Sequence, residues 1–388
     1  MLRCPDSGSR QSPPSPRYAR VRSGIPGSRH SWGQVKASIG NPCAVEAEWH
    51  SLPWHAWHWP TDGPHREAAR AVTWGTALGT HLRRNLTREQ RVFVVIPVRN
   101  RRQLTLGCLA CLVTQTYPAL SIVIVDDGSS DGTAAAIRAD YQGVEVLRGD
   151  GHLWWTGATN LGVQWCLQRA SSSDYVLTLN DDTTMRPDYV ARLVSAAQGA
   201  PGALIGSTLV DSRDGQTVLA SGVRMRWLTA GAHNLGRGRS LAELQLASTL
   251  VHDVDLLSGR GTLIPVEVFR RIGLYDRRRL PHYAADYEFS HRAVRAGFRL
   301  CVDHGAVVFN VDNTGGRSAV EPHSTTRRVL WRLTSRKSPT NGWYHIVYAR
   351  LVCPWYALPT YFVGYYVRLF AAAARRRMRC GSPTTLVS

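Results

Sequence analysis

Two adjacent carboxylates, Asp181 and Asp182, follow an apolar run in the segment YVLTLNDDTTMRPDYV. Carboxylate oxygens are the ligands that hard divalent cations such as Mg²⁺ and Mn²⁺ prefer. A cation at this position would neutralise a diphosphate leaving group, for which the surrounding sequence offers few lysines. The pair therefore predicts a divalent-cation site. The alternative interpretation is that both residues belong to turns or helix caps.

Other carboxylates follow similar patterns elsewhere in the chain. Asp126 and Asp127 end a second apolar run in IVIVDDGSSDGT, where they could accept hydrogen bonds from a base or a ribose. Asp286 opens the helical pattern DYEFSHRAVRAGF in the second half of the chain, so it can approach the same site from the opposite side. A carboxylate there could take a proton from an attacking hydroxyl group.

The elements that must position these residues alternate between strands and helices. Apolar runs at 91–98, 120–125, 143–149 and 175–179 predict buried strands, and helical periodicity follows each of the first three. Strands and helices that alternate at this spacing form a mostly parallel α/β sheet. Ligands bind outside the carboxyl ends of such strands. The loops at those ends should therefore converge on one edge of the sheet: 97–100, 126–129, 149–155 and 180–182.

The second half of the chain has a less regular pattern. Strands are expected within 202–210 and 217–227, and a strand that runs into a helix near Pro265 or Val266. The helix that begins at Asp286 should stop at Gly297, and a closing strand should follow within 299–312.

The motifs VVIPVRN, QTYP, IVIVDDGSSDGT, TLNDDT and DYEFSHRAVRAGF, in this order, closely resemble family 2 glycosyltransferases over residues 90–315. The segments GHLWWTGATNLGV and LNDDT are most similar to the rhamnosyltransferase-like branch. The resemblance implies the GT-A nucleotide-diphospho-sugar transferase fold. It also implies inverting hexosyl or rhamnosyl transfer, assisted by Mg²⁺ or Mn²⁺, in polysaccharide or cell-wall biosynthesis. The donor would be a nucleotide-diphosphate sugar and the acceptor a hydroxyl of a glycan or lipid-linked molecule.

The same resemblance implies the roles of individual residues. Asp182 would be the metal ligand and Asp286 the catalytic base of a single displacement. Glu288, its acidic neighbour, would bind substrate or pair with Arg292, four residues further on. The other implied substrate-binding residues are Pro97, Asp126 and Asp127 near the base, Gly157 and Asn160 near the diphosphate and ribose, and Asp181 at the ribose or metal.

Two positions depart from the family pattern. Arg99 stands where an aromatic residue is often found, and its guanidinium could stack on a base instead. Asn310 and Asn313 stand where many relatives offer a histidine, so the third protein ligand of the metal stays open.

The composition of the 388 residues limits the classes of partner that the protein can have. Lys and Arg number 47 against 28 Asp and Glu, for a net charge of +19, which favours anionic partners or indicates basic, unfolded ends. The eight cysteines form no repeating framework, which favours thiols in a reducing cytosol. Residues 1–90 contain no secretory signal pattern and predict a disordered or loosely docked arm. A metal site in the His- and Trp-rich tract of this arm is the less favoured alternative.

The segment 355–379 combines aromatic residues with a closing run of arginines. This pattern favours an interfacial helix on an anionic membrane, with a spanning helix or ordinary core packing as alternatives. We therefore expect a helical, membrane-associated region at 316–388 and a cytoplasmic protein held peripherally on the inner face of the cell membrane.

Other function classes remain to be weighed. The serious alternative is a catalytically inactive relative that binds nucleotide sugars. A sugar-nucleotide pyrophosphorylase is disfavoured because a Gly-rich nucleotide loop is missing after the first strand. A nucleic-acid-binding protein would suit the charge, but no clustered RNA- or DNA-binding pattern is present, so no nucleic-acid partner is expected. A protein that uses its basic surface only to bind membranes is the remaining alternative.

Overall fold

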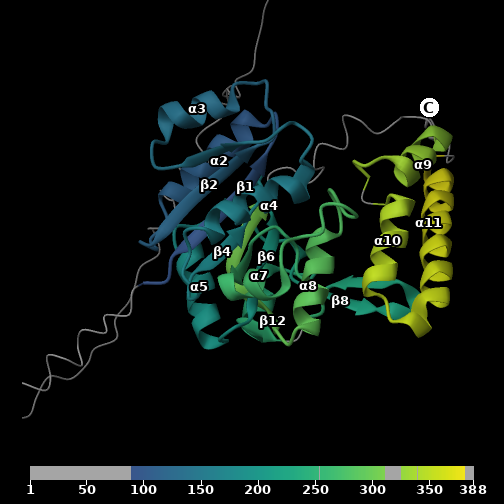
Figure 1. Cartoon of the computed structure of the whole chain (residues 1–388). Helices are drawn as coiled ribbons and strands as arrows, with labels where there is room; N and C mark the ends of the chain where they lie inside the picture. Colours follow the sequence, from purple (N-terminus) through teal and green to yellow (C-terminus); the bar gives the residue numbers. More distant parts are fainter. Residues whose placement is uncertain (1–88, 253, 311–324, 339, 381–388) are drawn as a thin grey trace, which may run out of the picture. The chain divides into compact units, whose positions relative to one another are not determined.

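The structure, a computed structural model, describes residues 89–252, 254–310, 325–338 and 340–380 (Figure 1). All of them belong to one compact unit at 48–388. The arm predicted at 1–90 lies outside the described residues, except for its last two positions, and so does Asn313.

The first half of the unit forms the parallel part of the central sheet. The strands β1 (Val92–Val98), β2 (Leu120–Asp126), β3 (Glu145–Arg148) and β4 (Tyr175–Thr178) are ordered β3-β2-β1-β4, and each neighbouring pair is parallel. All four strands predicted from apolar runs are therefore confirmed.

The second half extends the same sheet with mixed directions. Strand β11 (Thr262–Pro265) lies antiparallel between β4 and β6 (Leu204–Asp211), and β12 (Leu300–Asn310) runs parallel to β6. The strands β10 (Leu250–His252) and β5 (Thr183–Met185) pair with β12, and β7 (Val218–Ala220) pairs with β6. A separate hairpin is formed by β8 (Val223–Arg226) and β9 (Gly231–Asn234). The expected mostly parallel α/β sheet is confirmed.

Helices cover both faces of the sheet, because alternate side chains of the strands point to opposite faces. Val94 and Ile96 of β1 pack in one apolar cluster with residues of α2 (Arg102–Val113) and α5 (Tyr189–Gly199). Phe93 and Val95 pack in the other cluster with residues of α4 (Trp154–Leu167), α7 (Val266–Ile272) and α8 (Ala285–Arg295). Of the shorter helices, α3 (Thr133–Asp140) packs against β3 and α2, and α6 (Leu241–Ala247) packs against β12. Both faces of β1 are thus shielded from water.

The chain closes with the helices α9 (Thr325–Thr334), α10 (Gly342–Val352) and α11 (Leu358–Cys380), with the 3₁₀ turn η3 (Trp355–Ala357) before α11. Figure 1 shows α10 and α11 side by side. Tyr348 of α10 is buried in the same cluster as Phe289 of α8. Tyr361 of α11 packs against Trp227, in the turn η2 (Trp227–Thr229) that joins β8 to β9. Part of the region expected at a membrane surface therefore packs as ordinary core.

No helix in the described part of the chain combines the length and apolar character needed to cross a membrane. The helical segment near the carboxyl end nevertheless exposes large apolar and aromatic side chains. Trp355 is 83% exposed, Val363 65% and Val367 61%. These side chains leave the interfacial interpretation as a prediction.

Candidate active site

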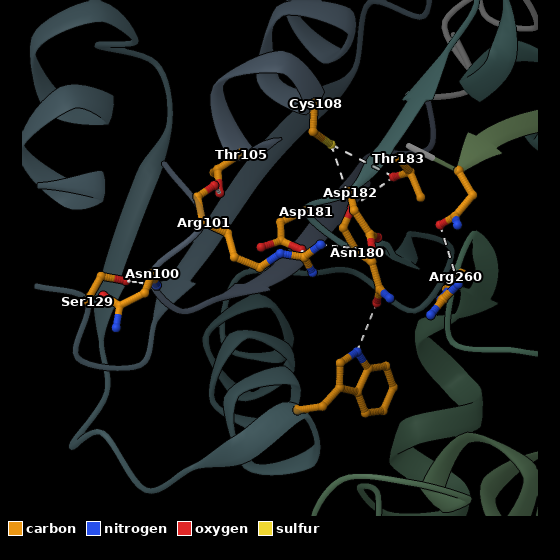
Figure 2. A network of polar contacts seen from close by, with 12 residues as sticks. Asn100, Arg101, Thr105, Cys108, Ser129, Asn180, Asp181, Asp182, Thr183 and Arg260 are labelled. Atoms are coloured by element: carbon orange, nitrogen blue, oxygen red, sulfur yellow. Dashed lines mark hydrogen bonds and ion pairs between the residues drawn. The ribbon is translucent and has the colours of Figure 1, made fainter. Parts of the chain in front are cut away.

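The carboxylates of Asp181 and Asp182 lie just beyond β4, at its carboxyl end, and both side chains are buried. Arg101, which directly precedes α2, faces them across the end of the sheet. Its Nη1 donates to Asp181 Oδ1 at 2.9 Å, and its Nη2 donates to Asp182 Oδ2 at 3.1 Å (Figure 2). One guanidinium thus bridges two carboxylates that would otherwise repel each other.

The remaining oxygen of each carboxylate, Asp181 Oδ2 and Asp182 Oδ1, is buried without a hydrogen-bond partner among the described residues. Burial raises the pKa of Asp181 to about 7; Arg101 lowers it and the neighbouring Asp182 raises it further. A buried carboxylate oxygen without a hydrogen-bond partner lowers the stability of the fold unless a ligand binds it. Two hard oxygen donors on adjacent residues suit Mg²⁺ or Mn²⁺, so the residues present fit the expected cation.

A third protein ligand is not found where the sequence left it open. No group of three or more His, Cys, Asp or Glu residues suited to a metal occurs in the described ranges. Asn310, at the end of β12, accepts a hydrogen bond from Arg260 Nη1 at 3.3 Å. The described residues thus offer the cation two carboxylates and leave other positions for water or phosphate oxygens.

Asp127 anchors the loop between β3 and α4. Its Oδ1 accepts from the backbone amides of Gly151 at 2.8 Å and Leu153 at 3.2 Å, and its Oδ2 accepts from Trp154 N at 3.1 Å. Arg99 lies over this loop, half exposed, with Nη1 3.9 Å from Asp127 Oδ2 and donating to the Gly151 carbonyl. Asp127, which is predicted to bind the nucleotide base, therefore holds the conformation of the loop between β3 and α4.

Asp126 lies beside a cavity of about 370 Å³, lined by the 128–132 loop and by Arg138 and Arg148. One of its oxygens, Oδ1, accepts from Ser129 N at 2.9 Å. Pro97 is half-buried in β1, where it pairs with Val125 of β2. The predicted base-binding residues thus gather at the carboxyl ends of two neighbouring strands, and Asp126 is the carboxylate that lines the cavity.

Trp155 connects the two halves of the site. Its Nε1 donates to Asn180 Oδ1 at 3.0 Å, next to the Asp181–Asp182 pair. Its ring also packs on Gly259, where a Cβ atom would lie only 2.4 Å from the indole. The amide of Gly259 donates to Asp286 Oδ2 at 2.9 Å. Only glycine allows the indole to approach this closely. The contact and the hydrogen bond together hold Asp286 of α8 near the edge of the sheet.

Asp286 lies in the first turn of α8 and is partly exposed. Burial raises its pKa, and the hydrogen bonds from Gly259 and Tyr287 oppose that rise. The charge of Arg260 lowers the pKa of both Asp286 and Asp181, because its guanidinium lies near each carboxylate. The structure therefore brings together the predicted base and the predicted metal ligands, with Arg260 between them.

Three predicted substrate-binding residues make contacts within the scaffold. Asn160 of α4 uses its amide within the protein: Nδ2 donates to the Tyr275 carbonyl at 2.8 Å and Oδ1 accepts from Tyr275 N at 3.0 Å. Gly157 is buried, and a Cβ atom there would lie 3.2 Å from Leu153 Cβ. Glu288 is buried and pairs with Arg292 at 2.9 Å, so the pairing expected from the four-residue spacing is confirmed.

Backbone strain is concentrated around the site. Positive φ at residues other than glycine occurs in the described chain at Asn100, Trp154, Ala230 and Ala284. Asn100 follows β1, Trp154 starts α4 and Ala284 precedes α8. Such conformations persist where the surrounding structure enforces them, and they cluster at functional sites. For a bulky residue such as Trp154 the conformation is a clear outlier.

Sequence reasoning missed Arg101, Arg260 and Trp155. A basic cluster at the end of the first strand, RNRR, and the segment SGRG in the second half were the available indications. The partners of these side chains lie 25 or more residues away in the chain, so their roles could not be read from spacing.

The sequence model described as glycosyl transferase family group 2 matches residues 175–388, more than half of the chain. The model described as glycosyl transferase family 2 matches residues 93–244. The chain belongs to glycosyltransferase family 2. The resemblance carried by the five sequence motifs is therefore confirmed, and the site lies within the matched residues.

Individual relatives of this family 2 glycosyltransferase are distant. It is 31% identical over 125 residues to polyprenol monophosphomannose synthase of Mycolicibacterium smegmatis, which is 31% of this chain and 46% of the relative. It is 26% identical over 204 residues to N-acetylglucosaminyl-diphospho-decaprenol L-rhamnosyltransferase of Mycobacterium tuberculosis, 49% of this chain and 66% of the relative. The match to the first of these thus spans less than half of that relative's length.

Among solved structures, the chain is similar to a mannosyltransferase from Pyrobaculum calidifontis in complex with GDP-Man and Mn²⁺. The identity is 19% and the TM-score 0.44, over 76% of this chain and 77% of that one.

Proposed function

We propose that this protein is an inverting glycosyltransferase that moves a sugar from a nucleotide-diphosphate donor to a hydroxyl group of a glycan or lipid-linked acceptor. One arrangement carries the proposal. Buried carboxylate oxygens without partners, on Asp181 and Asp182, are connected through Trp155 and Gly259 to Asp286. A cation that neutralises the leaving diphosphate and a general base that takes the proton of the attacking hydroxyl suit a single displacement.

The donor half of the site lies along the carboxyl ends of β1, β2 and β4. The cavity beside Asp126 would receive the nucleotide, and the half-exposed Arg99, next to Asp127, would be available for stacking on the base. A divalent cation held by Asp182 and Asp181 would neutralise the diphosphate as it leaves. Arg260 is placed to add positive charge on the other side of the same oxygens.

The acceptor half of the site centres on Asp286. The Gly259 amide orients its carboxylate, and the raised pKa makes it a better proton acceptor than an exposed aspartate. The acceptor hydroxyl would lose its proton to Asp286 while its oxygen attacks the anomeric carbon and the nucleotide diphosphate departs. One displacement without an enzyme nucleophile inverts the anomeric configuration.

Similarity to enzymes named for polyprenol and decaprenol substrates supports a lipid-linked acceptor in polysaccharide or cell-wall biosynthesis. The rhamnosyltransferase among them supports a rhamnosyl or other hexosyl donor. The exposed aromatic and apolar side chains of η3 and α11 support peripheral attachment to the cytoplasmic face of a membrane.

The proposed function is tested by incubating the full chain with a panel of nucleotide sugars, with and without Mn²⁺ or Mg²⁺, and measuring release of the nucleotide diphosphate. Metal-dependent release that disappears in Asp182→Asn is expected. Nuclear magnetic resonance of the product should show an inverted anomer. Nucleotide binding without turnover of any sugar would favour the inactive relative, and a retained anomer would exclude the single displacement.

A further inference from the structure

A second cavity has a volume of about 770 Å³. It is bounded by the loop before α4, by the loop before α8, and by the segment that joins α9 to α10. We call it the arginine pocket, after four residues that line it: Arg277, Arg278, Arg279 and Arg336.

The charge of the pocket is strongly positive. Asp150 is its one acidic lining residue, and that carboxylate accepts a hydrogen bond from His152 N at 2.8 Å. Arg279 pairs with Asp276, whereas no ion pair of Arg277, Arg278 or Arg336 is found within the described ranges. Converging guanidinium groups of this kind recognise phosphate oxygens, often through two parallel hydrogen bonds.

The loop that carries three of these arginines is held in place. Thr156, at the start of α4, donates two hydrogen bonds to this loop. Its amide donates to the Pro281 carbonyl at 3.1 Å, and its hydroxyl donates to the Leu280 carbonyl at 2.7 Å. Leu280 is fully buried, and Tyr283 OH donates to the carbonyl of Lys337, the residue after Arg336, at 3.3 Å. A site whose backbone is fixed before binding loses less entropy when the ligand arrives.

Aromatic residues complete the lining. Trp154 lies against His282, with ring centroids 5.6 Å apart, and Trp343 at the start of α10 is 66% exposed. Tyr365 of α11 donates to the Thr340 carbonyl at 3.0 Å, so this level of α11 lies next to the start of α10. The exposed indole of Trp343 therefore gives the charged pocket apolar surface that a hydrocarbon chain could contact.

The pocket shares no lining residue with the cavity beside Asp126, and the loop held by Asp127 contributes Leu153 and Trp154 to it. Trp154 lines the pocket, while its neighbour Trp155 contacts Asn180 and packs on Gly259. The arginine loop also precedes Asp286 by only a few residues. The packing of Trp155 on Gly259 and the continuation of the arginine loop into α8 thus connect the pocket to the proposed base.

We propose that the arginine pocket binds a phosphate or diphosphate group of the acceptor and so places the acceptor hydroxyl at Asp286. This inference rests on the proposed function for the identity of the molecule, although the pocket itself is defined by its arginines. The ligand class is a phosphorylated, lipid-linked glycan.

The test measures binding of inorganic pyrophosphate to the full chain by calorimetry without divalent cations, so that a metal at Asp181 and Asp182 does not contribute. The double variant Arg277→Gln/Arg278→Gln should bind at least tenfold more weakly than the wild type. The control Arg186→Gln/Arg224→Gln removes two exposed arginines elsewhere and should change affinity less than twofold. Geranyl diphosphate should displace pyrophosphate from the wild type, as a lipid-linked ligand requires.

Binding of UDP, dTDP and GDP in the presence of Mn²⁺ separates this inference from the proposed function. Nucleotide binding should be unchanged in the arginine double variant and lost in Asp182→Asn. Equal pyrophosphate affinity in the double variant and the wild type would show that the arginine pocket does not bind pyrophosphate. A parallel loss of nucleotide binding in the double variant would assign the pocket to the donor and overturn the acceptor role. If no nucleotide binds any of the proteins while pyrophosphate binding still follows the arginines, the proposed function fails and the phosphate pocket stands.

Discussion

The guanidinium of Arg101 lies 3.1 Å from the Asp182 carboxylate, measured from Nη2 to Oδ2, and holds Asp181 with its other nitrogen. The Arg101 guanidinium therefore binds one oxygen of each carboxylate. The other two oxygens, Asp181 Oδ2 and Asp182 Oδ1, have no hydrogen-bond partner among the described residues. A divalent cation that binds those oxygens would share the pair with Arg101. Protein stability and cation binding should consequently depend on each other.

Replacing Arg101 by glutamine should expose this dependence. Removing one partner of a buried ion pair leaves uncompensated charge, so Arg101→Gln should lower the free energy of unfolding by about 3 kcal/mol. Mn²⁺ should raise the melting temperature of the variant more than that of the wild type. The neighbouring, exposed Arg102→Gln is the matched control. Similar melting temperatures for the two variants, with or without Mn²⁺, would show that Arg101 does not stabilise the pair.

Asp286 and Glu288 lie two residues apart on α8 and should behave differently. Asp286→Asn should lower turnover by about 100-fold or more, the lower limit for loss of a general base, while nucleotide binding survives. Glu288→Gln breaks the pair with Arg292, which also donates to the Leu274 carbonyl, so its main effect should be on the melting temperature. If Glu288→Gln is as inactive as Asp286→Asn and equally stable, the base has been assigned to the wrong carboxylate.

Stability should fall with acid because of His345. Its ring packs on Tyr365 with centroids 4.0 Å apart, and burial lowers its pKa to about 4. The unfolded chain, with a histidine pKa near 6.5, binds this proton more readily. Stability should therefore be complete above about pH 6.5 and decline by about 1.4 kcal/mol per pH unit for this group between pH 6.5 and 4.

Urea unfolding at pH 7.5, 6 and 5 measures this effect. His345→Phe keeps an aromatic ring beside Tyr365 and should flatten the decline, whereas the exposed His233→Phe should not. His282, whose pKa burial also lowers to about 4, should contribute a second decline of the same sign, whereas Asp181, whose pKa is raised, acts in the opposite direction. A decline of the same steepness in His345→Phe and the wild type would contradict the assignment.

Membrane attachment is best tested by substitution. Truncation after Asn341 would remove Tyr348 and Val352, which are buried against α8, and would uncover the core. The triple variant Trp355→Ser/Val363→Ser/Val367→Ser changes exposed side chains only. Sedimentation with phosphatidylglycerol vesicles should fall at least tenfold in this variant. High salt should release the wild type only in part, because apolar burial is not screened.

The control for attachment replaces exposed apolar residues elsewhere, Val113→Ser/Leu246→Ser, which are 55% and 88% exposed. This variant should sediment with vesicles as the wild type does. Failure of the wild type to sediment at low salt would exclude the interfacial interpretation.

The sequence by itself determined the strands β1 to β4, the position of Asp181 and Asp182 at a strand end, and the place of Asp286 in the first turn of α8. These features depend on periodicity and on neighbours within one element, as does the Glu288–Arg292 pair, which follows from a spacing of four on a helix. Local patterns of this kind can be recognised in the amino-acid sequence.

Only the tertiary structure decided which distant side chains meet. Insertion of β11 between β4 and β6 carries Gly259 and Arg260 to the sheet edge, and the close packing of Trp155 on Gly259 brings Asp286 with them. The same packing turned Asn160 toward Tyr275 and gathered arginines from two separated segments into one pocket. Contacts between residues a hundred positions apart depend on strand order and on the direction of each side chain. Neither repeats along the sequence, so no local pattern records them.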